Sequence, residues 1–375
     1  MLEIEQEEET STQLISYIAH AAPATRRPAT CREPYLRPEI GFTPHWFHEA
    51  LGIDFGEKWH INPVYRADSI VAMAGEIAAR FGSRCEIGVM QSSDNPVDLL
   101  TGTFGALLVP ELYGVASWYQ EADWPWSEHG PHYSDEMVDA LEPPDLDENV
   151  FWNDFMEQLD WIEKQTGQIA GFMNWQGVVN TSYRLRGESL FTDMIVAPDR
   201  VELLFDCISQ TMIEGIQRLY SRQEESGVKL THITISNCMV NMLSPKHYQK
   251  FVLPYDLRMA EAFTMIGVHN CAWNANPYLD HYAEIPKVAY IDMGIESNLV
   301  KAKALFPKAR RAIMYTPMDI ANKDYDDLAT DLKYIAQNYG PCDLVCADID
   351  TGTPDKRVHE IYELCEKLSE EYSTH

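Results

Sequence analysis

Basic residues are few in this chain, and their scarcity limits the partners that it can bind. The 375 residues include 29 lysines and arginines against 58 aspartates and glutamates, which gives a formal charge of −29 at pH 7. A surface of this sign repels the phosphates of nucleic acids and the headgroups of anionic lipids. The composition therefore argues against a nucleic-acid-binding protein and against a protein of the membrane surface.

Long hydrophobic runs are also missing. No uninterrupted apolar stretch approaches the ~20 residues that a membrane-spanning helix needs. The first nine residues, MLEIEQEEE, are acidic where a signal peptide would be basic and then apolar. We therefore predict a cytoplasmic protein, whose eight cysteines we expect to be reduced.

Glycine-rich phosphate-binding loops follow none of the predicted strands, yet strands and helices alternate regularly from residue 149 onward. Predicted strands begin at Gln168, Leu230, Ile266, Val288, Arg311 and Asp343. Each is followed by a helical pattern, which implies a parallel sheet covered on both faces. At least six such units, with one or two strands before residue 150, predict a (β/α)8 TIM barrel rather than an open nucleotide-binding sheet.

The N-terminal part has a less regular pattern. We predict an acidic tail and an extended arm over residues 1–41, followed by a single barrel domain over residues 42–375. Within these regions, the apolar spacing over Gln13–Ala22 favours a short helix. The run Gly105–Pro110 resembles a buried strand that ends at a proline.

The segment Ile266–Cys271 carries the strongest chemical signal. A short apolar run ends in His269 and Cys271, and strand alternation points both side chains to one side, with Asn270 facing away. Imidazole and thiolate are ligands that zinc prefers. Because a lone pair of such residues is also common in protein cores, the segment by itself leaves a structural role open.

In a (β/α)8 barrel the active site lies where strands end and βα loops begin. Chemically capable residues at these positions are Asn174, Trp175, Ser236, Asn237, Cys238, His269, Cys271, Asp292, Tyr315, Cys346, Asp348 and Asp350. Asp292 is placed to orient His269 from behind, as carboxylates do for zinc-bound histidines. We therefore assign catalytic roles to His269, Cys271 and Asp292.

Six residues are predicted to bind substrate: Asn174, Trp175, Arg186, Asn237, Tyr315 and Asp350. Arg186, with Arg184 and Asp193, either anchors a substrate carboxylate or forms an ion-pair network that stabilises its loop. Asp350, with Asp348, either contributes a ligand or caps the last helix.

Several motifs together resemble the uroporphyrinogen decarboxylase superfamily, and its zinc-dependent, corrinoid-linked methyltransferases more than its true decarboxylases. They are Asn174-Trp-Gln-Gly, the stretch from Arg184 to Asp193, Leu243-Ser-Pro with Pro254, His269-Asn-Cys271, and the segment from Asp348 to Pro354. They span about residues 42–370. The Arg-Gln-Ala-Gly-Arg-Tyr stretch that true uroporphyrinogen decarboxylases share has no match in the N-terminal arm.

The resemblance implies a (β/α)8 barrel with one Zn²⁺ held by His269, Cys271 and a later cysteine. Cys346 is the candidate, since it lies 75 residues after Cys271 and shortly before Thr353-Pro354. Its neighbours Val345 and Ala347 replace a glycine that is usual in the family, so Cys238 or Asn237 is an alternative third ligand.

The function implied is a methyltransferase that exchanges a methyl group between a small substrate (a thiol, ether or amine) and a corrinoid protein that supplies the corrinoid. A homodimer is compatible with the sequence. The alternatives are a metal-free decarboxylase of an unidentified organic acid on the same barrel, and a non-catalytic subunit of a methyltransferase complex.

Overall fold

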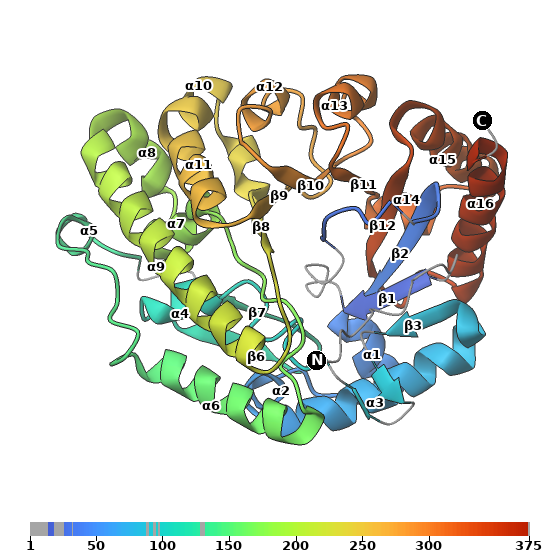
Figure 1. The fold of residues 1–375 in the computed structure, drawn as a ribbon, viewed down its shortest axis with the longest axis horizontal. Coiled ribbons are helices and arrows are strands. Elements are labelled where there is room, and N and C mark those ends of the chain that lie inside the picture. The colour runs from blue at the N-terminus through green and yellow to red at the C-terminus, as the bar shows by residue number, and fades with distance from the viewer. Residues whose placement is uncertain are drawn as a thin grey trace.

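The computed structural model describes residues 14–18, 26–31, 33–87, 90–92, 95–96, 98–127 and 132–373. Its centre is an eight-stranded sheet in the order β3-β1-β2-β12-β11-β10-β9-β8, and all pairs in this sheet are parallel. The strands surround the centre of the molecule and the long helices lie outside them (Figure 1). The predicted (β/α)8 barrel with an N-terminal extension is thereby confirmed.

The bounds of the strands in this sheet are β1 Leu14–Ile18, β2 Leu36–Phe42, β3 Cys85–Ile87, β8 His232–Ser236, β9 Met265–His269, β10 Val288–Met293, β11 Arg310–Met314 and β12 Cys342–Ile349. The segment predicted as a strand from Gln168 makes only isolated bridges in the described structure. Gln176 bridges to Ser236 and Ala170 bridges to Asp98, both in parallel. These bridges place the segment beside β8, at the position of a barrel strand.

The N-terminal region differs from two expectations. The helix predicted over Gln13–Ala22 is wrong where the structure describes it, because Leu14–Ile18 form β1, which pairs with both β2 and β3. Two available strand edges override a weak helical period. β2 lies in the stretch expected to be an extended arm, so the predicted boundary between residues 41 and 42 falls inside this strand. The acidic tail, residues 1–12, lies outside the described residues.

Capping residues fix several helix ends as the sequence indicates. Helix α6, Val150–Thr166, begins after Asn149, whose side chain accepts a hydrogen bond from the Trp152 amide, and ends at Gly167 with φ 80°. The strand predicted over Gly105–Pro110 is wrong. Gly105 has φ 54° in a turn, and Pro110 lies inside helix α4, Leu108–Leu112, near a helix start where proline costs little.

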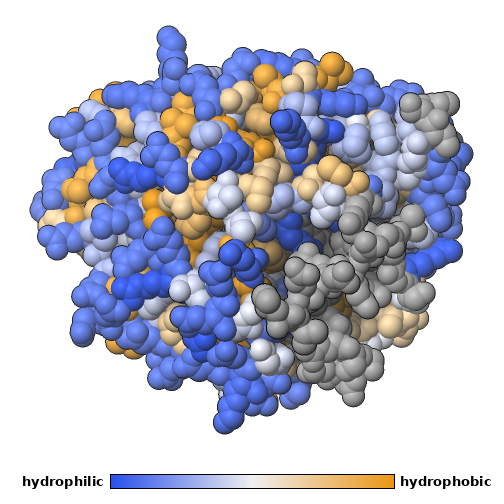
Figure 2. Space-filling view, in the orientation of Figure 1, coloured by the Kyte–Doolittle hydropathy of each residue, from blue (hydrophilic) through white to orange (hydrophobic). Residues whose placement is uncertain are grey.

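The other helices that matter for the site pack around the barrel. They are α1 Pro44–Leu51, α2 Glu57–Ile61, α3 Pro63–Phe81, α7 Val178–Arg186, α8 Ser189–Val196, α9 Pro198–Glu225, α11 Leu253–Ala262, α15 Tyr325–Tyr339 and α16 Asp355–Ser373. None of the helices in the described part of the chain is long and apolar enough to cross a membrane. Hydrophilic residues cover most of the face seen in Figure 2, in keeping with the acidic composition.

A buried ionic cluster fills the barrel near the starts of its strands. Arg37 of β2 contacts Asp343 of β12 at 3.1 Å, and Arg310 of β11 contacts Glu39 at 3.1 Å. All four side chains are buried. The charged side chains at this end of the barrel are paired with one another. A functional site is therefore expected at the opposite end, where the strands finish.

Candidate metal centre

Two thiols and an imidazole meet where β8 and β9 end. The ligand atoms of Cys238, His269 and Cys271 all lie within 4.8 Å of one another. The Cys271 sulfur is 3.0 Å from Nε2 of His269 and 2.7 Å from the sulfur of Cys238. His269 is buried, whereas both cysteines are partly exposed. In the described part of the chain, this is the one group of three or more such side chains close enough to share a metal.

The register of two neighbouring strands produces this group. Ser236, the last residue of β8, pairs with His269, the last residue of β9. Each strand is then followed two residues later by a cysteine, Cys238 and Cys271. Cys271 has a φ of 56°, an uncommon conformation for a residue other than glycine, which often marks a functional turn.

Asp292 of β10 holds His269 from behind. Its carboxylate accepts hydrogen bonds from Nδ1 of His269 at 2.6 Å, from the Asn270 amide at 2.7 Å and from the Tyr290 hydroxyl at 2.9 Å. Asp292 is fully buried. A proton on Nδ1 leaves the Nε2 lone pair facing the two thiols, which is the tautomer that a metal ligand requires.

The electrostatics of the cysteine pair favour one thiolate. A hydrogen bond from Cys271 lowers the pKa of Cys238 well below its usual value, and the nearby His269 and Arg26 act in the same direction, against the effect of burial. The same hydrogen bond, together with burial, raises the pKa of the Cys271 thiol. Burial and Arg26 lower the pKa of His269, but Asp292 and Cys238 outweigh them and raise it.

These three side chains fit zinc. Two sulfurs and one nitrogen, with a carboxylate behind the imidazole, are the donor set and the supporting shell of a catalytic zinc that keeps a fourth position open. Tetrahedral zinc with bonds of about 2.3 Å sets its sulfurs about 3.8 Å apart. The sulfur atoms of Cys238 and Cys271 therefore need to separate by about an ångström, a movement that side-chain rotation can supply.

An Asp292→Asn variant is expected to bind zinc about 10–100-fold more weakly, because the amide neither holds the Nδ1 proton as firmly nor fixes the imidazole plane. Competition with a chromophoric chelator measures this affinity. The matched control is Asp331→Asn, whose carboxylate accepts a hydrogen bond from Tyr315 outside the site. Equal zinc affinity in Asp292→Asn and the unmodified protein would show that Asp292 has no part in holding the metal.

The structure does not bring Cys346 into this group. Asp343 of β12 points into the barrel, so alternation turns Cys346, three residues later, to the outside. Its thiol is fully buried, and it raises the pKa of Cys365 on α16, which burial already raises. Cys346 therefore faces the helix layer, whereas Cys238, the alternative considered from the sequence, lies beside His269 and Cys271.

Among the residues predicted to bind substrate, Asn174 contacts the last residue of β8. Its side-chain oxygen accepts a hydrogen bond from the Ser236 hydroxyl at 2.9 Å. Trp175 points outward, because its ring lies against α9, 3.5 Å from where a Cβ on Gly215 would be. Asn174 and Trp175 are consecutive in an extended segment, so their side chains point in opposite directions. Asn174 faces the barrel interior, and Trp175 faces the surrounding helices.

Asn237 serves the scaffold. Its side-chain amide donates to Asp256 of α11 at 3.0 Å, and its backbone N–H donates to the His269 carbonyl at 2.8 Å. It thereby ties the end of β8 to the end of β9 and sets the position of the neighbouring Cys238.

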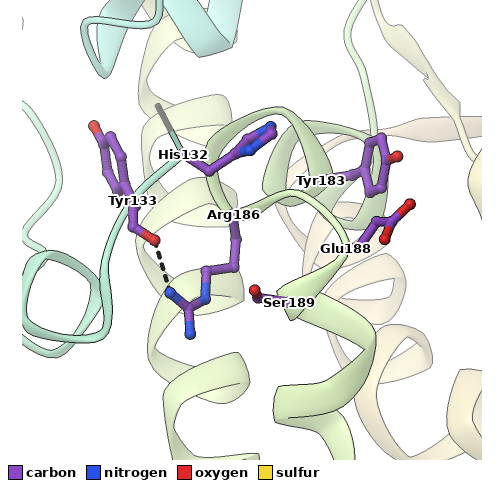
Figure 3. A pocket seen from close by; sticks show the side chains of 6 residues that line it. All are labelled: His132, Tyr133, Tyr183, Arg186, Glu188 and Ser189. Atoms are coloured by element: carbon purple, nitrogen blue, oxygen red, sulfur yellow. Dashed lines mark hydrogen bonds between the residues drawn. The ribbon is translucent and has the colours of Figure 1, made fainter. Parts of the chain in front are cut away.

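Arg186, Tyr315 and Asp350 have partners other than the three candidate metal ligands. Arg186 borders a pocket of about 450 Å³ beside α7 and α8 (Figure 3), but its guanidinium is committed to Asp193, Asp135 and the Tyr133 carbonyl. The Tyr315 hydroxyl donates to Asp331 of α15 at 2.5 Å. Asp350 accepts hydrogen bonds from Thr43 and from the Thr351 amide, next to α1.

Asp256 gives the scaffold around the site a dependence on pH. Burial raises its pKa from 3.8 to about 7, although Tyr248 and Asn237 donate hydrogen bonds to it. Between these values the unfolded chain has lost the proton that the folded chain keeps, so raising the pH favours unfolding. Relative to Asp256→Asn, the protein is expected to lose up to about 1.4 kcal/mol of stability per pH unit from about pH 4 to 7, and no more above. Urea unfolding of both proteins across this range measures the difference, and parallel curves would contradict the expectation.

Sequence reasoning missed Arg26. Its guanidinium lies 3.2 Å from Nε2 of His269 and 3.2 Å from the Ser236 hydroxyl, and its side chain is buried. No local pattern in the N-terminal arm indicates a contact with a residue 243 positions away. Asp348, a candidate ligand from the sequence, has a φ of 59° and an exposed surface, but its carboxyl interacts with Arg26 and His269, which act to lower its pKa while burial raises it.

Comparisons with known proteins agree with this fold. The family model described as Uroporphyrinogen decarboxylase (URO-D) matches residues 60–314, about two thirds of the chain. Among solved structures, a methyltransferase from Methanosarcina mazei is similar with a TM-score of 0.61 and 17% identity, covering 86% of this chain and 90% of that one. A comparison with curated proteins finds no match.

Two further structures have lower similarity. A protein assigned as a vitamin-B12-independent methionine synthase from Listeria monocytogenes has a TM-score of 0.37 and 11% identity, covering 58% of this chain and 69% of that one. A B12-independent methionine synthase from Shewanella sp. W3-18-1 has a TM-score of 0.35 and 13% identity, with coverages of 59% and 67%.

Proposed function

The chain belongs to the uroporphyrinogen decarboxylase family, and we propose that it is a cytoplasmic zinc-dependent methyltransferase within that family. In this proposal it exchanges a methyl group between a small thiol, ether or amine and the corrinoid of a separate protein. The observation that carries the proposal is the convergence of Cys238, His269 and Cys271 at the end of the barrel where the strands finish.

Cys238, His269 and Cys271 would hold the metal, and Asp292 would fix the imidazole. Zinc bound there supplies a Lewis acid for the sulfur, oxygen or nitrogen atom of the substrate, and it lowers the pKa of a bound thiol. The thiolate character of Cys238 prepares the site for a cation before any metal arrives. Asn174 and Ser236, which are hydrogen-bonded to each other at the end of β8, would offer polar contacts to a substrate.

The corrinoid partner follows from the chemistry. Methyl transfer to or from cobalt requires the corrinoid to approach the substrate heteroatom directly, so a partner protein has to cover the barrel end that carries Cys238 and Cys271. Both cysteines are partly exposed, which leaves an approach from that side.

Metal analysis combined with a methyl-transfer assay tests the proposal. Protein purified without added zinc is expected to contain about one zinc per chain, and to transfer methyl groups between free cob(I)alamin and at least one member of a panel of methylated thiols, ethers and amines. A stably folded protein without metal that binds none when zinc is added would contradict the proposal and favour the decarboxylase alternative. Zinc without transfer from any member of the panel would instead favour a non-catalytic subunit.

A further inference from the structure

Arg26 of the N-terminal arm reaches into the barrel beside the candidate metal centre. It is 6% exposed, and its two terminal nitrogens contact the Ser236 hydroxyl and Nε2 of His269, each at 3.2 Å. Its carbonyl accepts a hydrogen bond from the Thr234 hydroxyl at 2.8 Å. Backbone and side chain of Arg26 are therefore both held by the inner face of the barrel.

The inner faces of β8 and β9 leave room for this arm. Thr234 and Ser236 alternate onto the inner side of β8, and Thr234 pairs with Gly267 of β9. A Cβ on Gly267 would lie 2.2 Å from the Thr234 hydroxyl, so any larger residue would displace the group that holds the Arg26 carbonyl. Glycine at position 267 therefore lets the Thr234 hydroxyl stay where it binds the Arg26 carbonyl.

Arg26 and a metal need the same electron pair. A guanidinium only donates hydrogen bonds, and Nδ1 of His269 is directed to Asp292. In the tautomer with the proton on Nδ1, the Nε2 lone pair faces both Arg26, at 3.2 Å, and the Cys271 sulfur, at 3.0 Å. A metal at Cys238 and Cys271 would bind that lone pair. The conformation with Arg26 inserted and the conformation with His269 on a metal exclude each other.

The contacts of Arg26 are also weak enough for its side chain to be displaced from the barrel. Its buried Nε atom has no hydrogen-bond partner, and the carboxyl of Asp348, whose pKa Arg26 acts to lower, makes no hydrogen bond to it among the described residues. Both hydrogen bonds of its terminal nitrogens are at the long end of the usual range. A permanently buried structural arginine is normally satisfied more fully, as Arg66 is by four hydrogen bonds.

We propose that Arg26 is a displaceable guard of the metal position: zinc binding to Cys238, His269 and Cys271 expels it from the barrel, and its insertion opposes zinc binding. The inference rests on the proposed zinc site. It adds that the N-terminal arm and the metal centre are coupled, so that metal loading changes the exposure of a residue more than 200 positions away in sequence.

Brief digestion with trypsin reads the position of Arg26 directly, since the protease must take that side chain into its own pocket. The bond between Arg26 and Arg27 is expected to be cleaved slowly in metal-depleted protein and at least about tenfold faster after one equivalent of zinc is added. Cleavage after Lys308, which lies in an exposed turn far along the sequence, provides the internal standard. Mass spectrometry of the released peptide of residues 1–26 identifies the cut.

Substitution tests the reverse coupling. Arg26→Ala is expected to bind zinc about tenfold or more tightly, because a charge-assisted hydrogen bond no longer competes for Nε2. Arg27→Ala is the matched control: it removes the same charge from the next residue, whose guanidinium lies 5.9 Å from the ring centre of Phe172. A chromophoric chelator gives the zinc affinity of each protein.

The outcomes separate this inference from the proposed function. Faster cleavage after Arg26 with zinc, and tighter zinc binding in Arg26→Ala than in Arg27→Ala, support the coupling. Zinc binding at one per chain with unchanged cleavage after Arg26, or equal affinities in the two variants, overturns the coupling and leaves the zinc site standing. A protein that binds no zinc overturns both.

Discussion

Cys238→Ser protein is expected to lose its zinc, whereas Cys346→Ser protein is expected to keep it. The sulfur of Cys238 lies within 4.8 Å of the ligand atoms of His269 and Cys271, while Cys346 is fully buried in the layer between β12 and α16. Loss of a residue that merely supports a ligand weakens metal binding about 10–100-fold, so loss of a ligand itself should weaken it by more than about 100-fold. Mass spectrometry of the metal content of both proteins measures the contrast.

The two serine variants control for each other. Both replace a thiol by a hydroxyl of similar size, and circular dichroism should show that both keep the native helix content. Zinc retained in Cys238→Ser and lost in Cys346→Ser would place the third ligand on β12 and show that the described arrangement is not the one that binds metal. Retention in both would point to a two-residue protein site, His269 and Cys271.

Arg66→Met is expected to destabilise the fold by about 3 kcal/mol or more. The Arg66 side chain, on α3, is fully buried and donates to the carbonyls of Leu99, Trp59 and His60 and to the Gln158 side chain, at 2.7 to 3.0 Å. Burial lowers its pKa to about 9, so it stays charged near neutral pH. Methionine fills much of the volume but leaves several buried carbonyls without donors, each at a cost of about 1–3 kcal/mol.

Arg80→Met on the same helix is the matched control. Arg80 is partly exposed and forms ion pairs with Glu76 and Asp355, which water and salt screen. Its replacement should cost about 1 kcal/mol or less. Urea unfolding followed by tryptophan fluorescence compares the two variants, and equal losses of stability would contradict the role assigned to the buried hydrogen bonds of Arg66.

The barrel was predictable from sequence because its signals are local and repeated. Each strand is a short apolar run, and helices such as α6 carry an N-cap and a C-terminal glycine that act within one turn. The first region was predicted less well because β1 is defined by its neighbours β2 and β3, and apolar spacing over five residues does not distinguish a strand from a short helix.

The candidate metal centre was likewise predicted from the sequence only in part. His269 and Asp292 follow from their places at the ends of adjacent strands, and the structure joins them by a hydrogen bond of 2.6 Å. The choice between Cys238 and Cys346 required the inward or outward phase of each strand, which a shift of one residue reverses. Arg26 depends on the path of an arm with no regular structure, and no sequence pattern encodes such a path.

The long-range contacts of Arg26 also bear on the order in which parts of the chain fold. Its contacts join residues 210 and 243 positions apart, and closing loops of that length carries a large entropic cost before any contact is made. Thr234, Ser236 and His269 offer their hydrogen bonds only after β8 and β9 have paired. We therefore expect the Arg26 segment to dock after β8 and β9 have paired, although it precedes both strands in the chain.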